Sequence, residues 1–277
     1  MISPLPGTLY LVSTPIGNLE DMTHRAVRVL REAAVIACED TRQTRKLLDH
    51  YGITGPVVSY HDHNEAARTA ELLTRLERGE SVALVSDAGT PLVSDPGYRV
   101  LCAAVGRGFT VCPIPGPSAV LAGLVGSGLP VDQFFFGGFL PPKKGQRRKA
   151  LEGWKELPCT LIVYEAPHRI IDTLTDTEEL FGSRQVVVAR ELTKLHEEFL
   201  RGTSGEVHAI LAGRTAVKGE ITLLIGEAPE IAEDETPVEE AVATLVAGGM
   251  HPMDAMKAVA KRRGMSKRDV YARLQRG

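Results

Sequence analysis

Short apolar runs and amphipathic stretches alternate along the first third of the chain. The apolar runs have the length of buried strands and lie at 9–13, 35–38, 57–60 and 82–85. The stretches between them show the apolar spacing of helices, as at 23–33. Because strands that alternate with helices pair in parallel, residues 1–116 are predicted to form one doubly wound α/β domain.

A second series of apolar runs predicts another α/β domain over residues 117–228. These runs lie at 134–139, 160–164, 185–189 and 220–225. The segment 227–240 holds seven carboxylates and no Lys or Arg, which is typical of a linker. Residues 229–277 are therefore predicted to form an acidic linker and a small basic helical tail that resembles a helix-turn-helix.

Composition narrows the class of protein. With 277 residues and 43% hydrophobic side chains, the chain can fill two cores, and a net charge of −3 means that any nucleic-acid surface is a local patch. The four cysteines are far apart, which disfavours a zinc knuckle or a disulfide framework. No signal peptide is recognisable, so a cytoplasmic location is expected. The uncharged segment 108–131 contains four Pro and five Gly, which favours a buried turn and helix over a membrane span.

Polar, Gly and Pro residues directly follow six of the predicted strands. They begin at Thr14, Glu39, His61, Asp87, Glu165 and Ala189. Because parallel sheets bind ligands beyond the carboxyl ends of their strands, these loops indicate a ligand site at one rim of both sheets. For any single loop, ordinary turn formation explains the same residues. His61 and His63 have no third metal ligand at short spacing, so no metal site is predicted.

Two of these segments have turn chemistry that suits a small ligand. In the segment 86–97, Gly89 allows the backbone to approach a ligand closely, and prolines restrict the conformation of the loop. Backbone amides of this segment could then hydrogen-bond to an adenine or a ribose. In 115–119, proline precedes an apolar helix whose free N–H groups can hold a carboxylate. The phosphate loop GxxxxGK[ST] and the GxGxxG fingerprint are absent, which disfavours ATP and NAD.

Five ordered motifs, spread over nearly the whole chain, resemble those of the tetrapyrrole methylase superfamily. They lie at 15–18, 86–97, 115–119, 164–169 and 189–194. Within the superfamily they look most like those of the members that methylate the 2′-hydroxyl of a cytidine in 16S ribosomal RNA. The resemblance implies S-adenosyl-L-methionine in a cofactor cleft between two α/β domains, a homodimer, and the small ribosomal subunit as partner.

The resemblance also implies which residues line the cofactor pocket. Carried over by motif, these are Pro15, Ile16, Gly89, Thr90, Pro91, Val93, Gly116, Ser118, Ala119 and Ala166. Porphyrinoid members usually have Gly-Asp-Pro where this chain has Gly89, Thr90 and Pro91, which counts against a tetrapyrrole substrate and leaves the role of Thr90 open.

Four ionisable residues at predicted strand ends are the candidates for catalysis. Glu165 is predicted to be the general base that removes the hydroxyl proton, and His61 is the second candidate. Arg169 is placed to hold a substrate phosphate, and Lys194 adds a cation at the end of another strand. In the alternative interpretation, Glu165 is the ion-pair partner of Arg169 or Arg190.

Two clusters of basic residues can contact the phosphates of an RNA. The first cluster contains Lys143, Lys144, Arg147, Arg148 and Lys149. The second, in the tail, contains Lys257, Lys261, Arg262, Arg263, Lys267, Arg268, Arg273 and Arg276. Alternatively, the tail only stabilises a dimer. Two other functions stay open, a tetrapyrrole methyltransferase and a non-catalytic regulator that senses a ligand.

Overall fold

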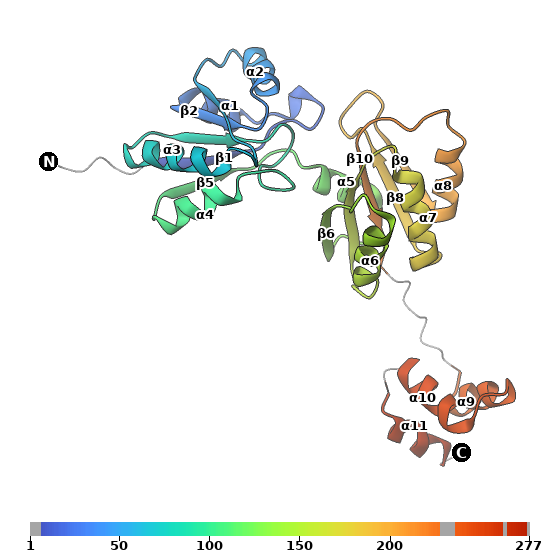
Figure 1. The fold of residues 1–277 in the computed structure, drawn as a ribbon. Coiled ribbons are helices and arrows are strands. Elements are labelled where there is room, and N and C mark those ends of the chain that lie inside the picture. Colours follow the sequence, from blue (N-terminus) through green and yellow to red (C-terminus); the bar gives the residue numbers. More distant parts are fainter. Residues whose placement is uncertain (1–6, 228–235, 263–264, 276–277) are drawn as a thin grey trace. The chain divides into compact units, whose positions relative to one another are not determined.

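The computed structural model describes residues 7–227, 236–262 and 265–275 (Figure 1). The chain divides into two compact units, Met1–Glu227 and Ala228–Gly277. The first unit contains two five-stranded sheets flanked by helices, and the described residues of the second unit form helices. The predicted α/β fold class, with a small helical tail, is confirmed. The predicted boundary at residue 116 stays a prediction, because it divides a single compact unit.

The first sheet has five parallel strands in the order β3-β2-β4-β1-β5. Its strands are β1 (Thr8–Val12), β2 (Val35–Cys38), β3 (Val57–Ser59), β4 (Val82–Val85) and β5 (Thr110–Ile114). Its helices are α1 (His24–Glu32), α2 (Thr41–His50), α3 (Glu65–Glu77) and α4 (Tyr98–Gly106), with a short 3-10 turn η1 (Leu19–Asp21). Helices α1 and α2 pack on one face, and α3 and α4 on the other. Because both faces are covered, β2 and β4 are buried throughout, which explains their uninterrupted apolar runs. We call this sheet with its helices the first lobe.

The second sheet is mixed and has the order β6-β7-β10-β8-β9. Its strands are β6 (Phe134–Phe139), β7 (Thr160–Glu165), β8 (Gln185–Arg190), β9 (Glu198–Thr203) and β10 (Ile221–Ile225). Its helices are α5 (Ala119–Ser127), α6 (Lys144–Trp154), α7 (Ile170–Phe181) and α8 (Ser204–Ala212). Helix α5 packs on one face and the other three on the opposite face. Since β7 and β8 are both antiparallel to β10, and β6 is parallel to β7, the carboxyl ends of β6, β7 and β8 share one edge. We call this part the second lobe.

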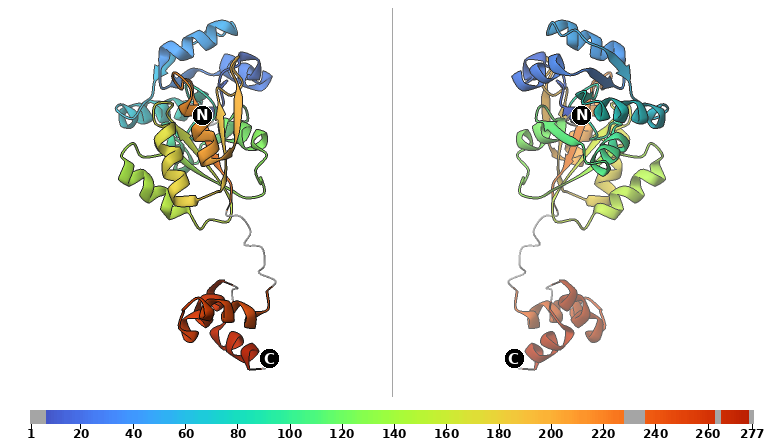
Figure 2. Two further views of the ribbon diagram at one scale, coloured as in Figure 1. Left: turned by 90° about the vertical axis from the view of Figure 1, so that its right-hand side faces the viewer. Right: turned by 90° about the vertical axis from the view of Figure 1, so that its left-hand side faces the viewer.

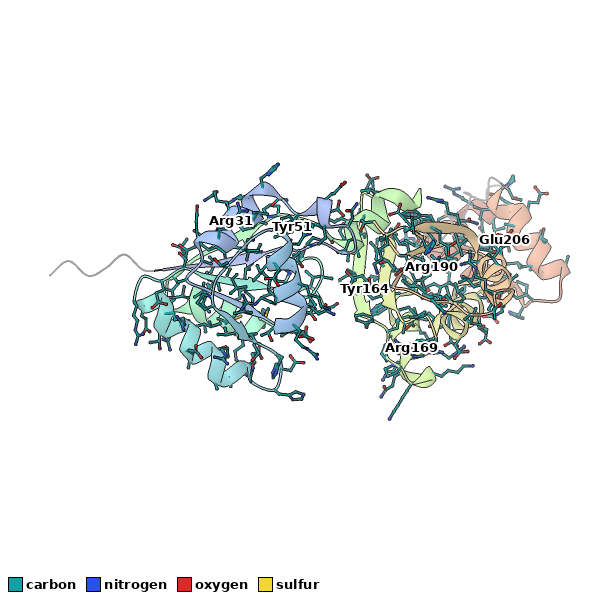
Figure 3. The ribbon with its side chains drawn as sticks, turned by 90° about the horizontal axis from the view of Figure 1, so that it is seen from above. Arg31, Tyr51, Tyr164, Arg169, Arg190 and Glu206 are labelled. Atoms are coloured by element: carbon teal, nitrogen blue, oxygen red, sulfur yellow. The ribbon has the colours of Figure 1, made fainter. Side chains whose placement is uncertain are left out.

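The loops that follow the strands bring the two lobes together. Ile16, in the loop after β1, is buried in an apolar cluster that contains Val120 and Leu124 of α5. Gly17 lies against the stem of Lys194, because a Cβ added to Gly17 would be 2.5 Å from Cγ of that lysine. Tyr164, at the end of β7, lies at the side of the second lobe that adjoins the first (Figure 3). The carboxyl edges of both sheets therefore meet at the junction of the lobes.

The predicted basic cluster after β6 is largely neutralised by the protein itself. Arg147 is 2% exposed and donates from Nε to the buried carboxylate of Asp176 at 2.8 Å. Arg148 pairs with the same carboxylate at 2.9 Å and also with Glu179. These two arginines hold α6 against α7, and Arg147 is too deeply buried to contact RNA phosphates, whereas for Arg148, whose side chain is 31% exposed, the contact stays a prediction. Lys143, Lys144 and Lys149 are exposed, and Lys144 Nζ also lies 3.9 Å from Asp176.

The second unit is a three-helix bundle with its own apolar core (Figure 2). Its helices are α9 (Val238–Ala247), α10 (Pro252–Arg262) and α11 (Lys267–Leu274). The predicted cap of the last helix is present, since Ser266 Oγ accepts a hydrogen bond from the backbone of Asp269 at 3.1 Å.

Two predictions about this unit need comment. The predicted acidic linker extended to residue 240, but α9 begins at Val238, so Glu239 and Glu240 belong to the helical bundle. Part of the predicted linker and tail lies outside the described residues, namely 228–235, Arg263, Gly264 and Arg276. The side chains of Lys261 and Arg262 are not described either. In the described segments, no helix has both the length and the apolar character needed to cross a membrane.

The buried pair of Arg147 and Asp176 gives a prediction for stability. Asp176→Ala should destabilise the protein by roughly 3–5 kcal/mol, because it leaves the buried guanidinium of Arg147 unpaired. Glu179→Ala removes a half-exposed carboxylate and leaves Arg148 paired with Asp176, so it should cost less than about 1 kcal/mol. Denaturant unfolding of both variants measures the difference. Equal, small losses would show that the buried pair does not hold α6 to α7.

Candidate functional site

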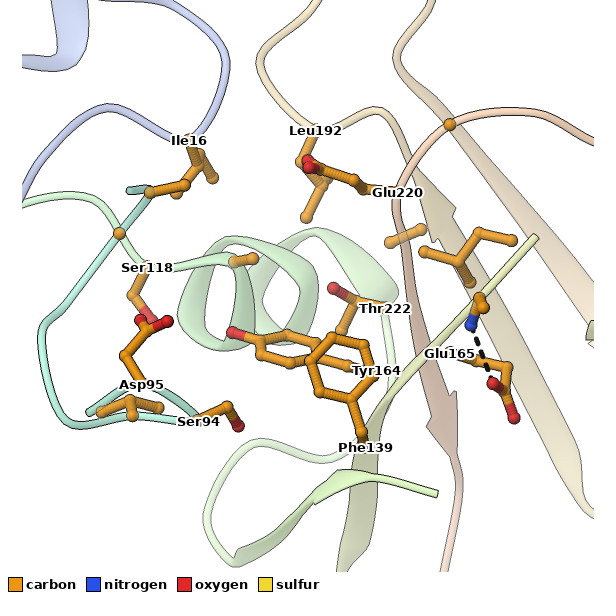
Figure 4. A pocket seen from close by; sticks show the side chains of 18 of the residues that line it. Ile16, Ser94, Asp95, Ser118, Phe139, Tyr164, Glu165, Leu192, Glu220 and Thr222 are labelled. Atoms are coloured by element: carbon orange, nitrogen blue, oxygen red, sulfur yellow. Dashed lines mark hydrogen bonds between the residues drawn. The ribbon is translucent and has the colours of Figure 1, made fainter. Parts of the chain in front are cut away.

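A pocket of about 420 Å³ lies at the junction of the two lobes (Figure 4). Cavities of roughly 300–1,000 Å³ are the usual size for small-ligand sites. The lining comes from the ends of β1, β4, β6, β7 and β8 with their loops, from the first turn of α5 and from the start of β10. The pocket thus lies at the rim where the strand-end residues predicted a ligand site.

The loop after β4 forms the wall from the first lobe. Thr14 and Gly89 pair through two backbone hydrogen bonds of 2.9 and 3.0 Å, and Gly89 has a φ of +80° that favours glycine. The amide of Gly89 is therefore occupied, and the prediction that other backbone amides of this loop read a ligand stays a prediction. Thr90 Oγ1 donates to the carbonyl of Pro117 at 3.2 Å and accepts from Ser13 Oγ at 3.4 Å. Thr90 thus ties this loop to β1 and to the segment before α5.

Three of the predicted cofactor residues, Pro15, Pro91 and Gly116, are not part of the pocket lining. A Cβ added to Gly116 would lie 2.8 Å from Cβ of Ser13. Glycine is therefore needed at 116 because the segment before α5 passes close to the end of β1. This close approach to Ser13 accounts for glycine at 116 without a ligand, and the contact of Gly116 with a cofactor stays a prediction.

The other seven predicted cofactor residues do line the pocket. They are Ile16, Gly89, Thr90, Val93, Ser118, Ala119 and Ala166. Lining a pocket does not identify the ligand, so their contact with a cofactor stays a prediction.

The amino terminus of α5 opens onto this pocket through Ser118 and Ala119. Ser118 caps the helix, with its Oγ accepting from the backbone of Leu121 at 3.5 Å. The first turn of α5 contains no acidic residue. The free backbone N–H groups and the positive end of the helix dipole can therefore bind a carboxylate in the pocket.

Glu165 lines the pocket, but both of its carboxylate oxygens are engaged. Oε1 accepts from the backbone of Ala166 at 2.7 Å and pairs with Arg169 Nη2 at 2.6 Å, and Oε2 accepts from Thr173 Oγ1 at 2.7 Å. The side chain is fully buried. This geometry favours the alternative interpretation, in which Glu165 is an ion-pair partner of Arg169 and holds the start of α7. Its role as a base stays a prediction.

The other three catalytic candidates lie outside the lining. His61 is placed beside Asn64, with 3.2 Å between its Nε2 and the amide nitrogen. Arg169 is bound to Glu165, as described above. Lys194 Nζ lies 2.9 Å from Glu191 and 2.8 Å from Glu220, the second of which lines the pocket. Burial acts to lower the pKa of Lys194, but the hydrogen bonds to both carboxylates outweigh it, so the pKa is raised and the ammonium stays charged.

Asp95 is a site residue that sequence reasoning missed. It lines the pocket from the loop after β4, and its pKa is raised to about 6, first by burial and then by the charges of Glu39 and Asp87. Tyr164 lines the same pocket, and burial with the nearby carboxylates raises its pKa to about 12, so its hydroxyl stays protonated. The signal for Asp95 was its place in the segment 86–97, which the prediction treated only as a backbone turn.

Metal ligation finds no support in the part of the chain that the structure describes, where no group of three or more His, Cys, Asp or Glu side chains is arranged to hold a metal ion. The rings of His61 and His63 are 5.9 Å apart between centroids, in an edge-to-face contact.

Comparison with known proteins identifies the family of this chain. The profile of the family "Tetrapyrrole (Corrin/Porphyrin) Methylases" matches residues 8–208. A "Ribosomal RNA small subunit methyltransferase I" from Halalkalibacterium halodurans is 50% identical and covers 96% of this chain and 93% of that protein. The protein of the same name from Mesorhizobium japonicum is 47% identical, over 98% and 92%.

Solved structures show the same architecture at low identity. A uroporphyrin III C-methyltransferase from Thermus thermophilus has a TM-score of 0.56 and 21% identity, and covers 80% of this chain and 98% of that chain. A diphthine synthase has a TM-score of 0.60 and 15% identity, over 79% and 90%. These likenesses show the fold alone.

Two α/β lobes with a pocket at their joined carboxyl edges define the class of two-lobed methylases. The chain belongs to the tetrapyrrole (corrin/porphyrin) methylase family. This confirms the resemblance drawn from the five motifs, and with it a methyltransferase.

The raised pKa of Asp95 predicts how its charge affects stability. The pKa of Asp95 rises from 3.8 to about 6 on folding, so the protonated carboxyl is favoured in the folded state. Its contribution to the free energy of unfolding is therefore complete below pH 3.8 and is lost as the pH rises through about 6. Asp95→Asn, which never ionises, should therefore unfold at a higher temperature than the wild type at about pH 7.5 and lose this advantage toward about pH 4. Thermal unfolding at several pH values measures it, with exposed Asp49→Asn as control. A pH-independent difference would contradict the assignment.

Proposed function

We propose that this chain transfers the methyl group of S-adenosyl-L-methionine to the 2′-hydroxyl of a cytidine in 16S ribosomal RNA of the small subunit. The observation that supports an RNA substrate is the 50% identity to a small-subunit ribosomal RNA methyltransferase over 93% of that relative. The choice of cytidine and of the ribose oxygen rests on the five motifs. The tetrapyrrole alternative has weaker support, because the solved porphyrinoid enzymes share only 16 to 23% identity and hence only the fold.

The residues of the pocket fit the proposed cofactor. The amino terminus of α5, capped by Ser118, offers N–H groups for the carboxylate of the methionine part. Apolar side chains of Ile16, Ala119 and Leu192 can pack against the adenine. The cofactor supplies a methyl group that is already activated. The protein therefore has to align the acceptor hydroxyl and remove its proton.

Among the carboxylates of the pocket, Asp95 is better suited than Glu165 to accept this proton. Both carboxylate oxygens of Glu165 are occupied by three donors, so neither is free to receive a proton from a substrate. Burial, followed by the charges of Glu39 and Asp87, raises the pKa of Asp95 and outweighs its hydrogen bond with Ser86. A pKa of about 6 leaves most of Asp95 deprotonated at neutral pH and still basic enough to act.

Each of the two units is proposed to contact RNA through its own exposed basic side chains. Lys143 and Lys144 follow β6 at the edge of the second sheet where the pocket lies, and both are exposed. Lys267, Arg268 and Arg273 are exposed on α11 of the tail. Contacts between such cations and phosphates provide the part of RNA affinity that does not depend on sequence.

A homodimer is also part of the proposal. Leu121 and Val125 lie one turn apart on α5, and they are 52% and 76% exposed. Such paired exposed apolar side chains are typical of a surface that another chain covers. A substrate in ribosomal subunits implies that the protein works in the cytoplasm.

The function is tested with the full chain and methyl-labelled S-adenosyl-L-methionine. Small ribosomal subunits that lack the modification should take up label, and nuclease digestion should release it as 2′-O-methylcytidine. Label in another nucleoside would overturn the assignment of the nucleotide. No label in subunits, with normal cofactor binding by calorimetry, would overturn the RNA substrate.

The identity of the base is tested by two isosteric variants. Asp95→Asn should lower the single-turnover rate of methyl transfer by about 10²–10⁴-fold, with cofactor affinity near that of the wild type. Glu165→Gln should lose less than about tenfold, because the amide oxygen can still accept from the backbone of Ala166 while the amide nitrogen donates to Thr173 Oγ1. The opposite ranking would assign proton removal to Glu165.

A further inference from the structure

Strand β6 contains a β-bulge at the edge of the pocket. It pairs with β7 in regular register as far as Phe136 opposite Ile162, and the next pair is Phe139 opposite Tyr164. Between these two pairs, β6 advances by three residues and β7 by only two, so β6 contains one extra residue. Gly137 and Gly138 occupy the bulge. Gly138 has a φ of +67°, which favours glycine, and a Cβ on Gly137 would lie 2.6 Å from the ring of Trp154.

The bulge changes the direction of the Phe139 side chain. In a regular strand, residues three apart point to opposite faces of the sheet. Here both Phe136 and Phe139 contact the ring of Tyr164, with 5.0 and 5.3 Å between ring centroids. Phe136 is partly buried in the cluster beneath α5, whereas Phe139 is 60% exposed and lines the pocket beside Tyr164 (Figure 4). The two glycines thus place an exposed aromatic ring at the site.

Packing does not account for this arrangement. A bulge interrupts the hydrogen bonds of the sheet, and the two glycines give up side chains that could pack. The side chain of Phe139, which the bulge directs toward the pocket, remains mostly exposed. Bulges next to active sites commonly re-aim a side chain toward the ligand.

The charges next to Phe139 indicate what kind of ligand this is. Four and five residues further along the chain, Lys143 and Lys144 are exposed at the start of α6. An exposed aromatic ring with lysines close by is typical of proteins that bind unpaired nucleotides, because the ring stacks on a base and the cations contact phosphates.

We propose that Phe139 stacks on the nucleobase of the nucleotide that is methylated, holding it out of the RNA stack so that its ribose reaches the pocket. This rests on the proposed RNA methyltransferase function. A base held out of the stack brings its ribose within reach of a recessed site, and a ring positioned by a bulge provides a fixed surface for that base. Tyr164 supports Phe139 from the side of the protein.

The experiment compares four variants in methyl transfer to small ribosomal subunits. Phe139→Ala and Phe139→Leu should raise the KM for subunits about 5- to 100-fold and change kcat less, because stacking on an aromatic ring is lost. Phe139→Trp should stay near wild type, since it keeps the stacking surface. Phe134→Ala, on the same strand and 44% exposed but outside the pocket lining, is the control and should behave as wild type.

Cofactor affinity and folding are measured on the same proteins. Calorimetry should find unchanged binding of S-adenosyl-L-methionine in Phe139→Ala. A parallel loss of cofactor affinity would overturn the proposal by assigning the ring to the adenine of the cofactor. A wild-type KM in Phe139→Ala, or a Phe139→Leu variant as good as Phe139→Trp, would overturn it while leaving the proposed function intact. If the wild-type chain itself does not methylate subunits, the proposed function fails, and the stacking role fails with it.

Discussion

Two backbone hydrogen bonds between Thr14 and Gly89 set the geometry on which the pocket depends. They join the ends of the neighbouring parallel strands β1 and β4 beyond the regular sheet. From there the next residue, Thr90, reaches the carbonyl of Pro117 and fixes the approach to α5. Ile16, two residues after Thr14, enters the apolar cluster of the second lobe. A contact between two short loops thus positions elements of both lobes around the pocket.

The parts of the fold that the sequence predicts are those in which a local pattern has one physical cause. The apolar runs of β2 and β4 could be recognised because both faces of a parallel sheet are covered. The rim of the pocket could be located because the carboxyl ends of parallel strands share an edge whatever their side chains. Strands β5, Thr110–Ile114, and β9, Glu198–Thr203, escaped prediction because both are edge strands of mostly half-buried or exposed residues. The segment 108–131, predicted as a buried turn and helix, thus begins with a strand.

The individual roles of site residues were harder to predict, since each depends on a partner that is distant in sequence. The sequence alone does not show that Ser13 passes beside Gly116 and by itself requires glycine there. Arg147 looks like an RNA contact until Asp176 is found next to it inside the protein. For Glu165, an ion pair with Arg169 or Arg190 was the alternative interpretation, and the structure contains the pair with Arg169.

The order of strands in the second sheet has a consequence for how the protein is made. Strand β10 lies between β7 and β8 but comes after both in the chain, so neither can complete its hydrogen bonds until residues 221–225 have been synthesised. The first lobe, whose five strands are complete at Ile114, can fold earlier on the ribosome. Since Ile221 and Thr222 also line the pocket, the nascent chain gains its binding site only with the insertion of its last strand. Partly synthesised chains therefore have no complete pocket with which to bind a ligand.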